Sequence, residues 1–150
     1  MSSWSVEEYA EDAFVDYLTR EVTADTMNFY PAGIEEIKYP CAVVLAGVSR
    51  NVGDTEFNGA REIDVQIAVM CDANDSTTQT ARVRNRTARD AVMTALAQTE
   101  LHADLNAMNP KGVVFSRAMI GDITRSTEGD QRVFVSEINV ETIAAPEVVK

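Results

Sequence analysis

One segment alternates apolar and polar residues without a break, and it constrains the fold more than any other feature of the sequence. Its apolar positions are Ile63, Val65, Ile67, Val69 and Cys71, and the positions between and before them are Glu62, Asp64, Gln66, Ala68 and Met70. Successive side chains of a strand point to opposite faces, so this pattern predicts a strand with one apolar face. The chain is therefore expected to build a sheet.

The other predicted strands flank this segment. Residues 41–48 form a continuous apolar run, which is typical of a strand that is covered on both faces. This run and the alternating segment are expected to pair as a hairpin across the polar stretch 49–60, which is too long for a tight turn. Residues 113–120 and 132–143 predict two further strands, joined by the polar loop 121–131.

Two helices are expected. The first is predicted at about 5–22, where Ser5 and Glu8 form a capping box and Trp4 and Tyr9 occupy the two staple positions around it. The second is predicted at about 77–99, after the cap residues Asn74, Asp75 and Ser76. Its apolar face is small at first, so it can lie close to a sheet; the residues are Ala81, Ala88, Val92, Ala95 and Leu96.

Residues 23–40 show no clear period, and we expect them to pack over a surface or to be held by a partner. Residues 109–112 form a breaker cluster before the third strand. The expected order is helix, strand, strand, helix, strand, strand. This order predicts an α+β fold, with a mostly antiparallel sheet and two helices packed on it. At 150 residues it is expected to be one domain, 1–150, with a core of about 5–143 and a flexible tail, 146–150.

Composition narrows the possible partners. The net charge is −11, which argues against broad nucleic-acid binding and against an anionic membrane surface as the partner. No apolar run approaches the roughly 20 residues that span a bilayer. The N-terminus lacks the positive and then apolar segments of a secretory signal, so the chain is expected to stay in the cytoplasm. Cys41 and Cys71 lie in apolar runs and are predicted to be two free, buried thiols.

The sequence contains no recognisable catalytic or metal-binding pattern. His102 is the only histidine, and no cluster of cysteine and histidine has the spacing of metal ligands. Nucleophile-elbow and phosphate-loop motifs are absent as well. A calcium loop beginning at Asp72 fails because Val83 stands at its twelfth position. We therefore expect a protein that is not an enzyme and has no cofactor, while a small-molecule-binding module or an unrecognised active site stays an alternative.

Positive charge gathers on the second predicted helix. Arg82, Arg86 and Arg89 follow helical spacing and share one stripe, and Arg84 adds to the local field. One interpretation is a solvated helix face, helped by an Arg86–Asp90 pair. The other is a contact with an acidic surface of a second subunit, since the arginine fork can bind a carboxylate bidentately. The first predicted helix offers such a surface through Glu8, Glu11 and Asp12.

The two polar loops also have two interpretations. They are ordinary hairpin tips, or they are arms that contact other proteins, because long loops cost little stability. In the second case the candidate contact residues are Asp54, Glu56, Phe57, Arg125 and Glu128.

Taken together, the pattern of elements resembles the tail terminators of long-tailed bacteriophages, which are related to other neck proteins. The matching features are the amphipathic first helix, the segment leading to residues 39–44, the strand 63–69, the helix around 87–92 and the final strand around 135–140. The resemblance covers about 5–143 and rests on the order and lengths of the elements, with no invariant motif.

Members of that family form a hexameric ring that caps the tail tube, ends its polymerisation and joins it to the head connector. The resemblance therefore implies a structural virion protein whose partners are itself, a tail tube protein and a head–tail connector or stopper protein. DNA would pass through the ring lumen without sequence-specific binding. It also implies assembly in the host cytoplasm and a final place at the neck of the virion. Another neck, head–tail joining or minor tail role is the alternative within the same class.

Replacing Arg82, Arg86 and Arg89 with glutamine is expected to weaken self-assembly. The replacement removes the positive charge of the stripe and keeps residues that favour a helix. Light scattering on the purified protein measures this directly. An unchanged mass after the triple replacement would contradict the interface role of the stripe.

Overall fold

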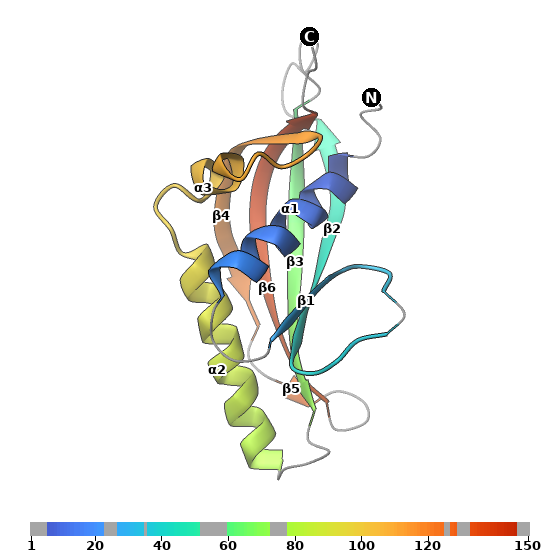
Figure 1. Cartoon of the computed structure of the whole chain (residues 1–150), viewed down its shortest axis with the longest axis vertical. Coiled ribbons are helices and arrows are strands. Elements are labelled where there is room, and N and C mark those ends of the chain that lie inside the picture. Colours follow the sequence, from blue (N-terminus) through green and yellow to red (C-terminus); the bar gives the residue numbers. More distant parts are fainter. Residues whose placement is uncertain are drawn as a thin grey trace.

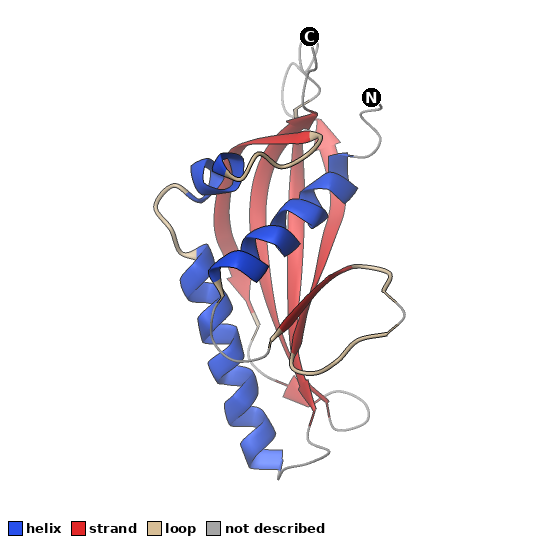
Figure 2. Ribbon diagram, in the orientation of Figure 1, coloured by secondary structure: helices blue, strands red, loops and turns tan. Residues whose placement is uncertain are grey.

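The computed structural model describes residues 6–22, 27–34, 36–51, 60–72, 78–124, 127–128 and 133–146. Three helices lie on one face of a single twisted sheet (Figures 1 and 2). The α+β class is confirmed, and three short elements, β1, α3 and β5, add to the predicted order. The elements run as α1 (Val6–Glu21), β1 (Asn28–Pro31), β2 (Cys41–Asn51), β3 (Arg61–Asp72), α2 (Thr78–Leu96), α3 (Leu101–Ala107), β4 (Val113–Ile123), β5 (Thr127–Glu128) and β6 (Val133–Pro146).

The sheet places the last strand of the chain in its middle. The strand order is β1-β2-β3-β6-β4, and β5 pairs with β6. Strands β1 and β2 are parallel, whereas every other pairing is antiparallel. The predicted hairpin of β2 and β3 is confirmed. Strand β3 also pairs with β6 without interruption, from Arg61 opposite Ala144 to Asp72 opposite Val133, so these two long strands form the spine of the sheet.

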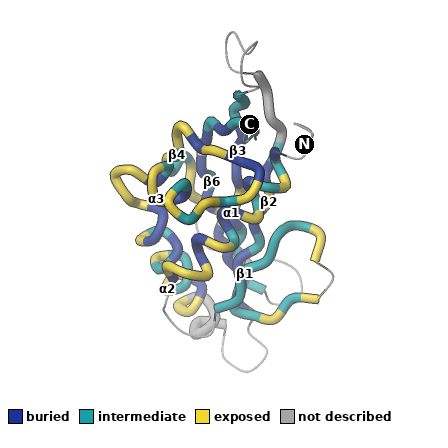
Figure 3. The backbone as a smooth tube through the Cα atoms, turned by 45° about the horizontal axis from the view of Figure 1, so that its top comes forward, coloured by how far each residue is buried: buried dark blue, intermediate teal, exposed yellow. Residues whose placement is uncertain are grey.

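The core lies between this spine and the helices, where the buried positions concentrate (Figure 3). The predicted apolar face of β3 is confirmed, and β6 alternates in the same way. Helix α1 crosses the sheet diagonally and packs Phe14 edge-on against Phe115 of β4, with ring centroids 5.7 Å apart. The buried residues of β3 and β6 are Ile63, Val65, Ile67, Val69, Cys71, Phe134, Ser136, Ile138, Val140, Thr142 and Ala144.

Two of the predictions about strands and loops were wrong. Strand β2 is not covered on both faces: the helices cover one face, and Leu45 on the other is 45% exposed. Residues 23–40 are not irregular throughout, since 28–31 form β1 and pair in parallel with 41–44. Strand β1 forms by parallel pairing with β2, which lies further along the chain, so no local sequence period predicts this strand.

Helix α3 was not predicted either; it buries Leu101 and Leu105 in the core, and one side chain joins it to β4 by hydrogen bonds. Asn106 Nδ2 donates to the carbonyl of Phe115 (2.7 Å), and the Phe115 N–H donates to Asn106 Oδ1 (2.9 Å). Strand β4 is an edge of the sheet, so the Asn106 amide takes the place of a neighbouring strand at this point. The predicted breaker follows α3, with positive φ at Asn109 (53°) and Gly112 (80°).

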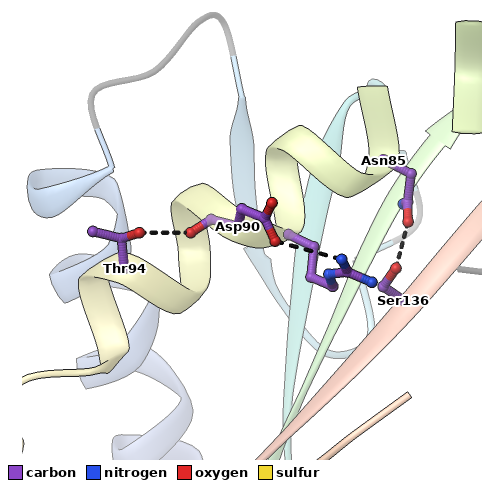
Figure 4. Close-up of polar contacts among 5 residues, drawn as sticks. Asn85, Asp90, Thr94 and Ser136 are labelled. Carbon is purple, nitrogen blue, oxygen red and sulfur yellow. Dashed lines mark hydrogen bonds and ion pairs between the residues drawn. The ribbon is translucent and has the colours of Figure 1, made fainter. Parts of the chain in front are cut away.

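A second asparagine fixes α2 on the spine. Asn85 is fully buried, and its Nδ2 donates to the carbonyls of Val69 on β3 (2.8 Å) and Phe134 on β6 (3.0 Å). Its Oδ1 accepts a hydrogen bond from the Ser136 hydroxyl (Figure 4). One side chain thus joins the helix to both central strands. At the other end of α2, the buried Tyr17 hydroxyl of α1 donates to the carbonyl of Ala95 (2.7 Å).

The two cysteines are free and buried, as predicted. Burial raises the pKa of the Cys41 thiol to about 12, with a smaller contribution from Cys71. The thiolate is the reactive form of cysteine, so this shift makes Cys41 a poor nucleophile.

Asn85→Asp is expected to lower the free energy of unfolding by about 3 kcal/mol or more, because the carbonyls of Val69 and Phe134 lose their donor and face a buried carboxylate. Urea denaturation at neutral pH measures this loss. The matched control is Ser136→Ala, which leaves both carbonyl bonds in place and should cost only about 1 kcal/mol. Equal losses in the two variants would contradict the bridging role of Asn85.

Candidate interaction surfaces

Arg86 and Arg89, two members of the predicted arginine stripe of α2, differ in exposure. Arg89 is mostly buried, with 18% of its side chain exposed, and its Nη2 lies 3.4 Å from Asp90 Oδ1. Asp90 therefore pairs with its neighbour Arg89, and the expected Arg86–Asp90 pair is not formed. Arg86 is exposed. The backbone of Arg82 lies in α2, and its side chain falls outside the described part of the structure.

The outward-facing cations of α2 are Arg84 and Arg86. Both are exposed, and neither has an ion pair or hydrogen bond among the described residues. Val83 lies beside them with 44% of its side chain exposed. The exposed side of α2 thus combines two arginines with an apolar residue, and the sequence analysis gave Arg84 only a secondary role.

The acidic candidates of α1 separate into two exposed residues and one half-buried residue. Glu8 and Asp12 are exposed, as expected for a polar helix face. Glu11 turns toward the sheet, where its Oε2 accepts a hydrogen bond from the Ala46 N–H (2.9 Å). The β2–β3 register shifts just after Ala46, so Glu11 binds the strand backbone at an irregularity.

Burial raises the pKa of the Glu11 carboxyl above its ordinary value of 4.5. The backbone N–H groups of Ala46 and Ala32 oppose this shift, while Asp12 and Glu8 add to it by repulsion. The pKa of Asp12 is also raised, first by burial and then by Asp16 and Glu8. Helix α1 therefore presents a crowded acidic face, which favours a cationic neighbour.

Two depressions flank α1. One, of about 440 Å³, is lined by Glu8, Glu11 and Asp12 together with the turn 31–33. The other, of about 350 Å³, lies between Asp12, Asp16 and Lys111, with Tyr9 on its wall. Neither offers the mainly apolar lining that small-molecule sites usually have.

Most of the loop candidates lie outside the described residues. This holds for Asp54, Glu56, Phe57 and Arg125, and also for Ser5 and Asn74–Ser76 at the predicted helix caps. The backbone of Glu128 lies in β5 and pairs with Phe134 of β6.

Within the described ranges, no group of three histidine, cysteine or acidic residues is placed to hold a metal ion. The same ranges contain no helix long and apolar enough to cross a membrane. His102 lies in α3 and is half-buried.

One further surface, which no sequence pattern singled out, is the face of the sheet that carries no described helix (the helix-free face). The polar half of the β3 alternation and its β6 neighbours lie there, with Asp64 directly opposite Glu141 in the register. Glu137 lies on the same face, and all three residues are exposed. The signal was present in the polar positions of the β3 alternation, but only the pairing of β3 with β6 brings the acids together.

No protein-family model matches the chain, and neither does any curated protein. Among solved structures, the fold is similar to that of a chain from "Virion of native gene transfer agent (GTA) particle". The two chains are 12% identical, the alignment covers 95% of this chain and 99% of the other, and the TM-score is 0.63. At this identity the likeness establishes a shared fold, and the fold extends over nearly the full length of both chains.

Glu11→Gln is expected to gain stability relative to the wild type as the pH rises. The folded state holds the Glu11 proton more tightly than the unfolded state, so wild-type stability falls as the pH rises from about 4.5 through the raised pKa. Denaturant unfolding of both proteins from about pH 4 to pH 7 tests this. A difference that stays constant with pH would contradict it. Glu11→Ala should be less stable than Glu11→Gln throughout, because the Ala46 N–H loses its acceptor.

Proposed function

We propose that this protein is a structural component of a phage-like virion. In this proposal it forms a hexameric ring, like that of tail terminators, which caps the tail tube, ends its polymerisation and joins it to the head connector. Its partners are further copies of itself, the tube protein and the connector protein.

The observation that carries this proposal is the full-length likeness to a chain of a gene transfer agent virion. The alignment leaves almost no part of either chain unmatched, so the likeness involves the whole domain and not one common motif. The resemblance of the sequence to tail terminators, which rests on the order and lengths of its elements, points to the same class of protein.

The surfaces are compatible with assembly. Helix α2 exposes Arg84 and Arg86, whereas α1 and the helix-free face expose carboxylates. A subunit with unlike charges on different sides is suited to a repeated heterologous contact, which closes into a ring when the rotation allows it. The net charge of −11 would also let such a ring repel DNA passing through its lumen.

The same structural likeness also supports an alternative role as a head–tail joining or minor tail subunit. The two roles differ in what they do to the tube, since a terminator stops tube growth and a joining subunit does not. The test is to polymerise the tube protein with and without this protein. If this protein is a terminator, its presence gives shorter tubes that are capped at one end; a joining subunit leaves tube length unchanged.

Purified protein is expected to assemble into a ring near six times the 16.4 kDa chain, or about 98 kDa. Light scattering at two salt concentrations, with electron microscopy of the same sample, measures mass and shape together. The ring should weaken at high salt if exposed ion pairs hold it. A chain that remains monomeric both alone and in the presence of tail tubes would overturn the ring.

A further inference from the structure

The helix-free face of the sheet carries an exposed apolar surface. In the described part of the chain, six large apolar residues are strongly exposed, and three of them lie on this face: Leu45 (45%), Val114 (45%) and Met119 (44%). They come from β2 and β4, on either side of the central strands β3 and β6. These three side chains lie on both sides of the central strands, so they frame the face and add apolar contacts for a protein bound over it.

Between these apolar residues lies a set of opposed carboxylates. Asp64 and Glu141 are direct partners in the β3–β6 register, and Glu137 lies four residues before Glu141 on the same face. Like charges directly opposite each other destabilise a sheet. None of the three has an ion pair among the described residues, and Arg117 of β4 lies against the Met119 sulfur (Nη2 to Sδ, 3.0 Å).

The complementary charge lies on the other side of the same molecule. Arg84 and Arg86 are exposed on α2, in the helix layer, next to the exposed Val83. Because the sheet separates α2 from the helix-free face, these arginines can meet the acids only in a second copy (Figure 1). Helix α1 does not suit this face, since its exposed Glu8, Asp12 and Asp16 would repel it.

We propose that the helix-free face of one copy binds α2 of the next, with Arg84 and Arg86 against Asp64, Glu137 and Glu141 and with Val83 against the apolar residues. The contact is heterologous, because helix layer meets sheet face, and its repetition generates a closed ring. This inference rests on the proposed ring and names its contact. It replaces the pairing of the α2 arginines with α1 acids that the sequence suggested.

Charge reversal tests the contact. Arg86→Glu and Glu141→Lys, each alone, are expected to weaken association by about tenfold or more, since each places like charges together. The double variant carrying both changes should recover much of the loss, because the unlike charges are restored in swapped positions. Sedimentation velocity over a concentration series measures all four proteins, including the wild type.

The matched control reverses the acids of α1 by Glu8→Lys and Asp12→Lys, which should leave association near the wild-type level. Folding is checked by thermal unfolding, and Glu141→Lys should be at least as stable as the wild type because it relieves the Asp64–Glu141 repulsion. This readout separates loss of contact from loss of fold.

Four outcomes would overturn the contact. If the ring still forms with Glu141→Lys and with Arg86→Glu, this contact is excluded, while the proposed function still stands. If the ring is lost only with Glu8→Lys and Asp12→Lys, the arginines of α2 contact the acids of α1 in the next copy. A ring that persists with Glu141→Lys but no longer caps tail tubes assigns the helix-free face to the tube protein. A wild type that stays monomeric both alone and in the presence of tail tubes overturns both the contact and the ring.

Discussion

The apolar side of β3 and β6 determines where everything else lies. These two strands pair along their whole length, and only one of their faces is apolar. Burying that face is the main favourable term available to a sheet of this kind, so all three helices are drawn to the same side. The opposite side keeps its acids and a few exposed apolar residues. The molecule is consequently two-sided, with a helix layer and a sheet face that no described helix covers.

Polar side chains then fix each helix in place by binding backbone groups of the sheet. Glu11 of α1 binds the N–H of Ala46 next to a register shift, and Asn106 of α3 binds both backbone groups of Phe115 on an edge strand. Asn85 of α2 binds carbonyls of both central strands. Such buried bonds add little net stability when made and cost much when broken, so they select one position of each helix. The direction in which α2 presents Arg84 and Arg86 follows from this anchoring.

The exposed charges of the described residues are unevenly distributed over the surface. The described residues bring together no metal cluster. The depressions beside α1 are lined by several carboxylates and short side chains, with Tyr9 and Lys111 beside one of them. What stands out is the separation of charge, with arginines on α2 and carboxylates on α1 and on the helix-free face. Unlike charges on opposite sides of a small domain favour head-to-tail association over two-fold pairing.

The sequence by itself determined the elements whose period is local. Helix α1 was predicted from its capping box, its staple residues and its helical spacing. Strand β3 was predicted from its alternation, because a half-buried strand repeats its apolar face every second residue. It did not determine β1, which depends on parallel pairing with β2, or the seven-residue α3, which Asn106 holds against β4. Periodicity placed Glu11 on a polar face, yet the approach of β2 turned it into a backbone acceptor. The meeting of Asp64 with Glu141, from strands far apart in the chain, was likewise decided only by tertiary structure, because strand order is set by how apolar faces are buried together and not by any local pattern.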